Sequence, residues 1–166
     1  MAGEERQRSY AWADPTTAWD QLGKLSGLDY LRAVRDGDLP KPPVAVAMRL
    51  ELREVDDGRV VYAGTPGEDF GNDVGSVQGG WVAGLLDAAI GSAVHSTLPA
   101  GVRYTTLELK VNYVRAVVPG SGPLRCEATA LHRGRRVGTA EAKITDGDGR
   151  LYAHATTTCL ILPAAG

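Results

Sequence analysis

The sequence has few cysteines, and their number excludes a disulfide-stabilised fold. Only Cys126 and Cys159 are present among 166 residues, too few for a disulfide framework. We expect both to be buried thiols in a reducing compartment; the alternative, a cysteine nucleophile, has no supporting sequence context. The three histidines, His95, His132 and His154, are far apart, and none has a carboxylate or cysteine at metal-ligand spacing. The sequence therefore predicts no metal and no redox cofactor.

The chain also lacks an excess of positive charge and a long uninterrupted apolar run. Its net charge is −2, which argues against a nucleic-acid partner because such proteins carry a basic excess or stripe. No segment reaches the roughly 18 uncharged apolar residues of a membrane span. The initial segment, MAGEERQRSYAWADP, lacks the apolar core of a secretory signal. We therefore expect a cytoplasmic protein that binds neither nucleic acid nor a membrane.

Alternating apolar and polar residues predict that most of the chain is β-strand. Strand-like segments occur at 44–53, 59–64, 103–115, 124–132, 136–145 and 151–162, and hairpin turns such as DDG separate neighbouring segments. Short strands joined in this way indicate an antiparallel sheet. Before them, residues 26–40 predict an amphipathic helix, which Ser26 caps and Gly37 and Pro40 end. Residues 1–25 are expected to be a polar N-terminal arm and residues 26–166 a single domain.

A second helix is predicted from VQGGWVAGLLDAAIGSAVHS at 77–96, where Asp87 is the only charged residue from Gly79 to Val94. Because this run is apolar on nearly every face, we expect the sheet to bury the helix on all sides. A lone carboxylate in such a helix has two interpretations. It is either a structural group satisfied by hydroxyls or backbone N–H groups, or a general base or nucleophile. His95, near the helix end, is expected to be a C-terminal cation or a satisfied polar group.

The start of the same helix offers a second group for catalysis. Backbone N–H groups in a first helical turn have no partner within the helix, and the helix dipole favours negative charge there. Glycine at positions 79 and 80 lets a ligand approach the backbone, which suits an oxyanion or a polarised carbonyl. Gly79 and Asp87 are eight residues apart, or about 12 Å along a helix, so one carbonyl cannot contact both. If both act on one substrate, they come from two chains of an isologous dimer.

The spacing of these residues resembles that of the PaaI-type acyl-CoA thioesterases, a family with the hotdog fold. The family pattern is an Asn, then Gly-x-Val-His-Gly-Gly, then an acidic residue eight positions after the first glycine of the pair. A second family pattern is matched by TLELKVNYVRA at 106–116. The resemblance covers about residues 26–162 and implies an α+β hotdog fold, in which a curled antiparallel sheet of about five to six strands surrounds one long central helix. The matching positions are Asn72, Gly75, Val77, Gly79, Gly80 and Asp87.

The resemblance also implies an activity. The family hydrolyses acyl-CoA or acyl-carrier thioesters, and it works as homodimers with shared active sites, often paired into homotetramers. By position, Asp87 would be the general base or nucleophile, and the Gly79 N–H would polarise the thioester carbonyl. Asn72 would orient the substrate or the attacking water. Thr106 would assist the acid, although strict strand alternation places it on the polar face with Glu108.

Further residues are predicted to contact the substrate. These are Gln78, Gly80, Trp81 and Arg115. The arginines at strand ends and in a turn either form a solvated edge or contact the phosphates of coenzyme A; they are Arg115, Arg133, Arg135 and Arg136.

Two positions depart from the family pattern. Gln78 stands where His is usual, and Ala116 stands where Pro is usual. Glutamine forms hydrogen bonds but does not titrate near neutral pH, so a non-catalytic acyl-CoA-binding hotdog protein is the alternative to a thioesterase. A hotdog dehydratase or hydratase is a further alternative, against which the lack of a histidine near Asp87 argues.

Overall fold

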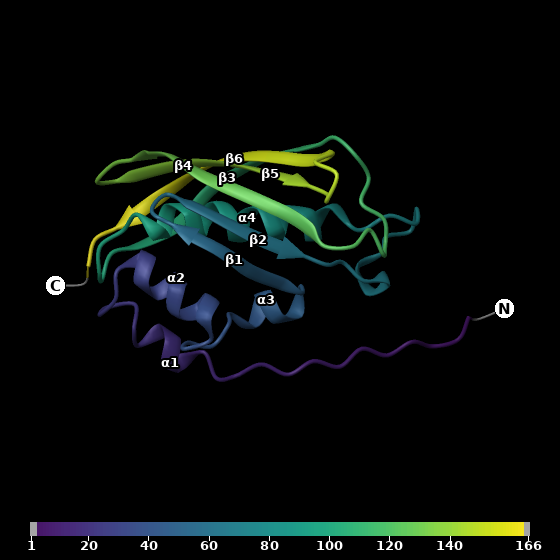
Figure 1. The fold of residues 1–166 in the computed structure, drawn as a ribbon, viewed down its shortest axis with the longest axis horizontal. Coiled ribbons are helices and arrows are strands. Elements are labelled where there is room, and N and C mark those ends of the chain that lie inside the picture. The colour runs from purple at the N-terminus through teal and green to yellow at the C-terminus, as the bar shows by residue number, and fades with distance from the viewer. Residues whose placement is uncertain (1–2, 165–166) are drawn as a thin grey trace.

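The computed structural model describes residues 3–164 and shows a curled antiparallel sheet around a central helix (Figure 1). The described strands pair in the order β1-β2-β4-β5-β6-β3, and all neighbours are antiparallel. This α+β hotdog architecture confirms the predicted fold class. The strands are β1 (Leu50–Asp56), β2 (Arg59–Gly64), β3 (Arg103–Tyr113), β4 (Leu124–Arg133), β5 (Val137–Thr145) and β6 (Leu151–Leu162). The helices are α1 (Thr16–Trp19), α2 (Gly27–Asp36), α3 (Pro43–Ala47) and α4 (Gly79–Ser96), with a short 3-10 helix, η1, at Glu68–Phe70.

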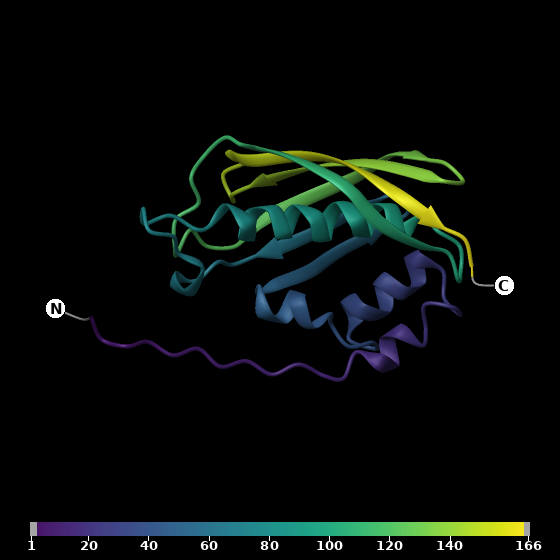
Figure 2. The same cartoon turned by 180° about the vertical axis from the view of Figure 1, so that it is seen from behind.

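Helix α4 occupies the inside of the curled sheet. The two opposite views show it between strands β3 to β6 on one side and β1 and β2 on the other (Figures 1 and 2). Leu85, Leu86 and Ile90 of α4 are almost fully buried there. Helix α2 packs against both β1 and α4. The apolar run at 77–96 thus forms the predicted central helix.

The sheet does not cover one face of α4, so the expectation that the sheet buries the helix on all sides is wrong. Asp87 and Gly80 are exposed on this face, and Ala83, Gly84 and Ala88 are half-buried, with the Met48 side chain against Gly84. These five positions follow the three- and four-residue spacing of one side of a helix. We call them the open face of α4. The apolar pattern predicted the helix correctly but overestimated how much of it a single chain covers.

Helix α2 forms as the sequence predicts. The Ser26 hydroxyl accepts a hydrogen bond from the Asp29 N–H (3.1 Å), which caps the helix start. Gly37 ends the helix in the left-handed conformation, with φ of 88°, which glycine adopts without steric cost. Leu31 and Val34 are buried against the core.

The first predicted strand is wrong over its first half. Residues 44–53 were expected to be extended, but Pro43–Ala47 form helix α3 and β1 starts only at Leu50. Pro43 stands at the first helical position, where its fixed φ suits a helix and its missing N–H is not needed. Arg49, which links α3 to β1, has a positive φ of 56°. The short alternation before Leu50 is therefore overridden by the prolines that precede it.

A β-bulge in β3 changes which side chains face α4. The pairing of β3 with β6 shifts between Thr106 and Glu108, so Leu107 is an extra residue in the strand. Strict alternation predicted Thr106 on the polar face; the structure instead turns Thr106 toward α4 and leaves Leu107 58% exposed. That prediction is wrong because one extra residue reverses the alternation on one side of the bulge.

His95 is half-buried near the end of α4, between aromatic rings. The ring centroids of Tyr30 and Tyr104 lie 5.4 Å and 5.5 Å from that of His95. Burial lowers the pKa of His95 to about 4, because an apolar environment disfavours the charged ring. His95 is therefore neutral at pH 7, and the expected C-terminal cation is wrong.

This half-buried histidine predicts that the protein loses stability in mild acid. In the unfolded chain His95 titrates near pH 6.5, so the unfolded state binds more protons than the folded state as the pH falls from about 6.5 to about 4. The free energy of unfolding should fall by about 3 kcal/mol over this window. Denaturant titrations at several pH values measure the fall, and His95→Phe should remove most of it. An unchanged pH slope in this variant would contradict the assignment.

No helix in the described range 3–164 has both the length and the apolar character needed to cross a membrane.

Candidate active site

Asp87 lies on the open face of α4, next to the edge strand β3. The Thr106 hydroxyl donates a hydrogen bond to Asp87 Oδ1 at 3.0 Å. Within residues 3–164, the other carboxylate oxygen, Oδ2, accepts no hydrogen bond. A purely structural carboxylate would have both oxygens satisfied in a buried site. Asp87 is instead exposed and held by one hydroxyl, which leaves one oxygen available for chemistry.

The start of α4 presents free backbone N–H groups. Gln78 is the N-cap residue, but its side chain makes no capping hydrogen bond. The N–H groups of Gly79 and Gly80 have no acceptor within the described part of the chain. The helix dipole adds partial positive charge at this point. Free N–H groups at a helix start favour a partly negative oxygen; the binding of a thioester carbonyl there stays a prediction.

Tyr113 covers one side of this first turn, and the sequence analysis did not identify it as a site residue. Its hydroxyl donates to the Gly79 carbonyl at 3.1 Å. Its ring lies so close to Gly79 that a Cβ at that position would be 3.4 Å from the ring atoms. The only signal in the sequence was its place in the matched strand segment 106–116. Tyr113 therefore binds the carbonyl oxygen of Gly79 and forms no hydrogen bond with its N–H group.

A hollow beside Gly79 brings several predicted residues together. It has a volume of about 330 Å³, and Asn72, Gly79 and Arg115 contribute to its lining, as does Tyr113. Arg115 also packs against the ring of Tyr152, with its guanidinium 5.8 Å from the ring centroid. Asp87 is not part of this hollow. One chain therefore holds the two halves of the predicted site at separate points of α4, about 12 Å apart by helix geometry.

Asn72 shapes the loop before α4. Its side-chain carbonyl accepts hydrogen bonds from the N–H groups of Val74 (3.1 Å) and Ser76 (3.0 Å), and its amide donates to the Ser76 hydroxyl (2.8 Å). These bonds close a turn of the kind that Asn side chains favour. Asn72 thus fixes one wall of the hollow beside Gly79. Its predicted contact with substrate or water stays a prediction.

Of the remaining residues predicted to contact the substrate, two are exposed and one is buried. Gln78 and Gly80 are exposed at the start of α4. Trp81 is only 3% exposed, and its indole N–H donates to the Met48 carbonyl at 2.9 Å. In this single chain Trp81 therefore packs in the core rather than facing the hollow. Its ring lies beside Gly64 of β2 and 6.1 Å from the Phe70 ring, between their centroids.

A cluster of charged and aromatic residues holds the loop that precedes α4. Asp69 forms ion pairs with Arg8 and with Arg49, the latter at 3.0 Å. Both guanidinium groups also lie near the Phe70 ring, at 5.1 Å and 5.9 Å from its centroid. The Phe70 carbonyl in turn accepts the Gln78 N–H at 2.8 Å. The N-terminal segment thereby contacts the loop that positions the start of α4.

Other predicted chemical groups are not part of this arrangement. Cys126 and Cys159 are free and buried, as expected, and burial raises the pKa of both thiols. Arg133 lies 3.9 Å from Asp57, and its hairpin lies near the C-terminal end of α4, where a Cβ at Gly138 would be 3.0 Å from Val94. No group of three or more His, Cys, Asp or Glu side chains in residues 3–164 is arranged to hold a metal ion.

Comparisons with known proteins identify the class to which this arrangement belongs. A family model described as the thioesterase superfamily matches residues 74–153. A candidate esterase of Saccharolobus solfataricus is 30% identical over 113 residues, which cover 68% of this chain and 79% of that protein. A candidate esterase of Halobacterium salinarum is 40% identical over 78 residues, 46% of this chain and 50% of that protein. The chain thus matches only half the length of the Halobacterium relative.

Solved structures narrow the class further. A phenylacetic acid degradation-related protein from Ralstonia eutropha JMP134 is 33% identical, with a TM-score of 0.72 over 79% of this chain and 98% of that one. The PaaI protein of the E. coli phenylacetic acid degradation operon has the same fold, with a TM-score of 0.73 at 20% identity over 86% of this chain and 99% of that one. The fold and the matched residues define a hotdog-fold protein of the thioesterase superfamily. Within that class, the chain belongs to the PaaI-type family.

Proposed function

We propose that this protein hydrolyses an acyl-CoA or acyl-carrier thioester to a carboxylic acid and a free thiol. The observation that carries the proposal is the Asp87 carboxylate, which stands exposed on the central helix of a thioesterase fold with one oxygen free. An acidic group on an otherwise apolar helix has no packing role at an exposed position. It suits a general base or a nucleophile.

The proposed reaction uses two groups. The Gly79 N–H donates a hydrogen bond to the thioester carbonyl oxygen and stabilises the negative charge that develops there. Asp87 takes a proton from a water molecule, whose oxygen adds to the carbonyl carbon; alternatively, the carboxylate adds directly and water later hydrolyses the resulting anhydride. In the first route the C–S bond then breaks, and the leaving sulfur takes up the proton that Asp87 holds. In the second route the C–S bond breaks as the anhydride forms, before water adds, and the sulfur takes up a proton from solvent. No metal or redox group is needed for either route.

We further propose that two chains assemble each site. The 12 Å spacing along α4 prevents one carbonyl from contacting Gly79 and Asp87 of the same chain. An antiparallel arrangement of two α4 helices around a two-fold axis would bring the two groups together. Two features support this dimer: the open face of α4 carries only small residues beside Asp87, and β3 is an edge strand that exposes Leu107 and Tyr113. Pairing of such dimers into a homotetramer follows from the family resemblance.

The substrate-binding part of the proposal concerns the hollow beside Gly79. Arg115 provides a cation there, suited to the phosphates of coenzyme A or of a carrier-bound pantetheine. Gln78 and Gly80 would border the thioester. Residues 26–166 would act as one hotdog domain, with residues 1–25 as an arm that contacts the loop before α4.

Thr106→Val should lower the rate of hydrolysis without unfolding the protein. Valine keeps the β-branched shape but cannot donate the hydrogen bond to Asp87 Oδ1. A hydrogen bond to a charged group is worth about 1.5–3 kcal/mol, so we expect kcat to fall roughly tenfold or more. Thr106→Ser, which keeps the hydroxyl, is the matched control. Equal rates for the valine and serine variants would remove Thr106 from the site.

A thiol-release assay with a panel of acyl-CoA and acyl-carrier thioesters tests the proposed function. Hydrolysis of at least one substrate, with release of the free acid, supports a thioesterase. Calorimetric binding of acyl-CoA without turnover would instead support the non-catalytic alternative, which the Gln78 substitution favours. Hydration of an enoyl-CoA without thiol release would support the hydratase alternative.

A further inference from the structure

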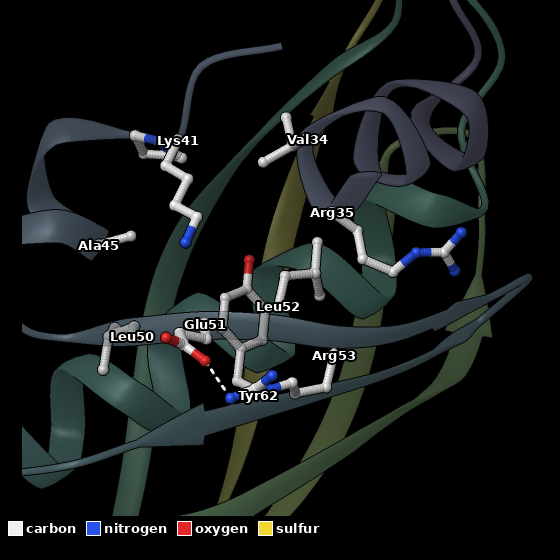
Figure 3. Close-up of a pocket in the computed structure, with 10 residues that line it drawn as sticks. Val34, Arg35, Lys41, Ala45, Leu50, Glu51, Leu52, Arg53 and Tyr62 are labelled. Carbon is white, nitrogen blue, oxygen red and sulfur yellow. Dashed lines mark ion pairs between the residues drawn. The ribbon is translucent and has the colours of Figure 1, made fainter. Parts of the chain in front are cut away.

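A second cavity lies between α2, α3 and the first hairpin of the sheet, and the reaction proposed above does not use it (Figure 3). Its volume is about 230 Å³. Its inner walls are apolar: Val34 comes from α2, Ala45 from α3 and Leu50 from β1, and all three are buried. The buried Tyr62 ring also lines it, and the Tyr62 hydroxyl lies 3.0 Å from the Ser92 hydroxyl of α4. The cavity is therefore preformed, with an apolar inner wall, and Tyr62 connects this wall to the central helix.

The rim of this pocket is cationic. Arg35, Lys41 and Arg53 contribute to the lining, against one carboxylate, Glu51. Arg53 is paired with Glu51, and Arg35 is paired with Asp36 at 2.7 Å. Lys41 forms no ion pair with any residue in the described range 3–164, and Figure 3 shows its ammonium group directed over the pocket. The rim thus carries one positive charge that no carboxylate among residues 3–164 neutralises.

The backbone around Lys41 is held in place. Pro40 precedes Lys41, and Pro42 and Pro43 follow it. Proline restricts its own φ and disfavours helical conformations of the residue before it. The backbone at Lys41 is therefore restricted by its proline neighbours, and its side chain starts from a fixed point at the rim of the pocket.

The pocket is separate from the candidate active site. Ser92, which contacts its Tyr62 wall, is five residues after Asp87 on α4. Five residues correspond to a rotation of about 140° around a helix, so the two groups face different sides. None of the lining residues of the pocket contributes to the hollow beside Gly79.

We infer that this pocket binds a small organic monocarboxylate, with its apolar body against Tyr62 and its carboxylate at Lys41. A single unpaired cation matches one negative charge better than a dianion such as a phosphate monoester. At about 30 Å³ per small group, the volume of about 230 Å³ accommodates roughly eight non-hydrogen atoms, which corresponds to a straight-chain acid of about six carbons. Hydrolysis of a thioester releases this class of molecule, but binding in the pocket does not depend on that activity.

Calorimetry with a series of straight-chain carboxylates, and with the corresponding neutral amides, tests this site. We expect affinity to rise with chain length until about eight non-hydrogen atoms and to fall beyond that. Each amide should bind about tenfold more weakly than its acid, because it lacks the charge that Lys41 contacts.

Three variants assign the binding to the pocket. Lys41→Met removes the charge but keeps the length of the side chain, and it should weaken acid binding about tenfold and leave amide binding unchanged. Lys24→Met, which alters an exposed lysine outside the pocket, is the matched control and should bind like the wild type. Leu52→Trp should abolish binding by filling the cavity, and thermal unfolding verifies that each variant is folded.

Specific outcomes would overturn the inference. Equal binding of acids and amides, or equal acid binding by wild type and Lys41→Met, would exclude the proposed contact. Binding that survives Leu52→Trp but is lost in Gly79→Pro would place the acid in the active site instead. Because the assay measures binding in the absence of any thioester, a protein without hydrolytic activity can still confirm the site, and an active thioesterase can still fail it.

Discussion

Asp87→Asn is expected to reduce kcat/KM for thioester hydrolysis by about 10³-fold. An amide can neither accept a proton from water nor attack a carbonyl, and loss of a general base or nucleophile costs roughly 10²–10⁴ in rate. The fold should be unaffected, because Asp87 is exposed and the asparagine oxygen can still accept the Thr106 hydrogen bond. Steady-state thiol release, with circular dichroism and thermal unfolding as checks, measures the effect.

The control for this variant is Asp38→Asn, which changes an exposed carboxylate between α2 and α3. It should retain full activity. An Asp87→Asn protein that keeps a tenth or more of the wild-type kcat/KM would show that the carboxylate has a structural role only.

Gly79→Pro is the second substitution with a large expected effect, because it removes the proposed carbonyl-binding N–H from an intact helix. Proline is well tolerated at the first position of a helix, and Gln78 already has the extended ψ of 133° that a residue before proline prefers. The lost N–H has no acceptor within the described residues, so folding does not require it. Removal of one such donor costs about 10²–10³ in kcat, and the same thiol-release assay measures it.

Gly79→Ala separates the loss of the donor from the addition of side-chain atoms. Its Cβ would lie in ordinary contact distance of the Tyr113 ring, at 3.4 Å, and its N–H is retained. We expect the alanine variant to keep most of the activity that the proline variant loses. Equal losses in the two variants would show that space beside Tyr113, and not the N–H, limits the reaction.

Mixing the two inactive variants tests whether two chains form each site. In a dimer of one Asp87→Asn chain and one Gly79→Pro chain, one site contains both substitutions and the other contains neither. After random exchange of equal amounts, half of the dimers are mixed, so about a quarter of the wild-type activity should return. If each site lies within a single chain, mixing restores nothing. A monomeric protein in sedimentation experiments would also exclude the shared site.

Local patterns in the sequence were sufficient to predict the strands and the central helix. The apolar run at 77–96 became α4, and the hairpin turn at 56–58 joins β1 to β2. The failures occurred where one residue overrides a pattern. Pro43 converts the start of an apparent strand into α3, and the extra Leu107 turns Thr106 toward α4. Neither event alters composition or average periodicity, so a periodicity argument does not detect it.

The candidate site residues could be selected from the sequence, but the residues that hold them in place could not. An isolated acid and a pair of glycines are visible in one sequence because their residue types are unusual for a buried helix. Tyr113 and the cluster of Arg8, Arg49 and Asp69 became apparent only when distant segments were brought together. Arginine and tyrosine are common on surfaces, and nothing local distinguishes those that position an active-site loop.

The burial of Trp81 gives the protein an intrinsic spectroscopic probe at the start of α4. Trp12 and Trp19 are 56% and 57% exposed, whereas Trp81 is 3% exposed and its ring lies 6.1 Å from that of Phe70. With phenylalanine in place of the two exposed tryptophans, the remaining fluorescence would come from an indole that is shielded from soluble quenchers. Its emission would then report, in real time and without a label, when the backbone at Gly79 shifts as a ligand enters or leaves.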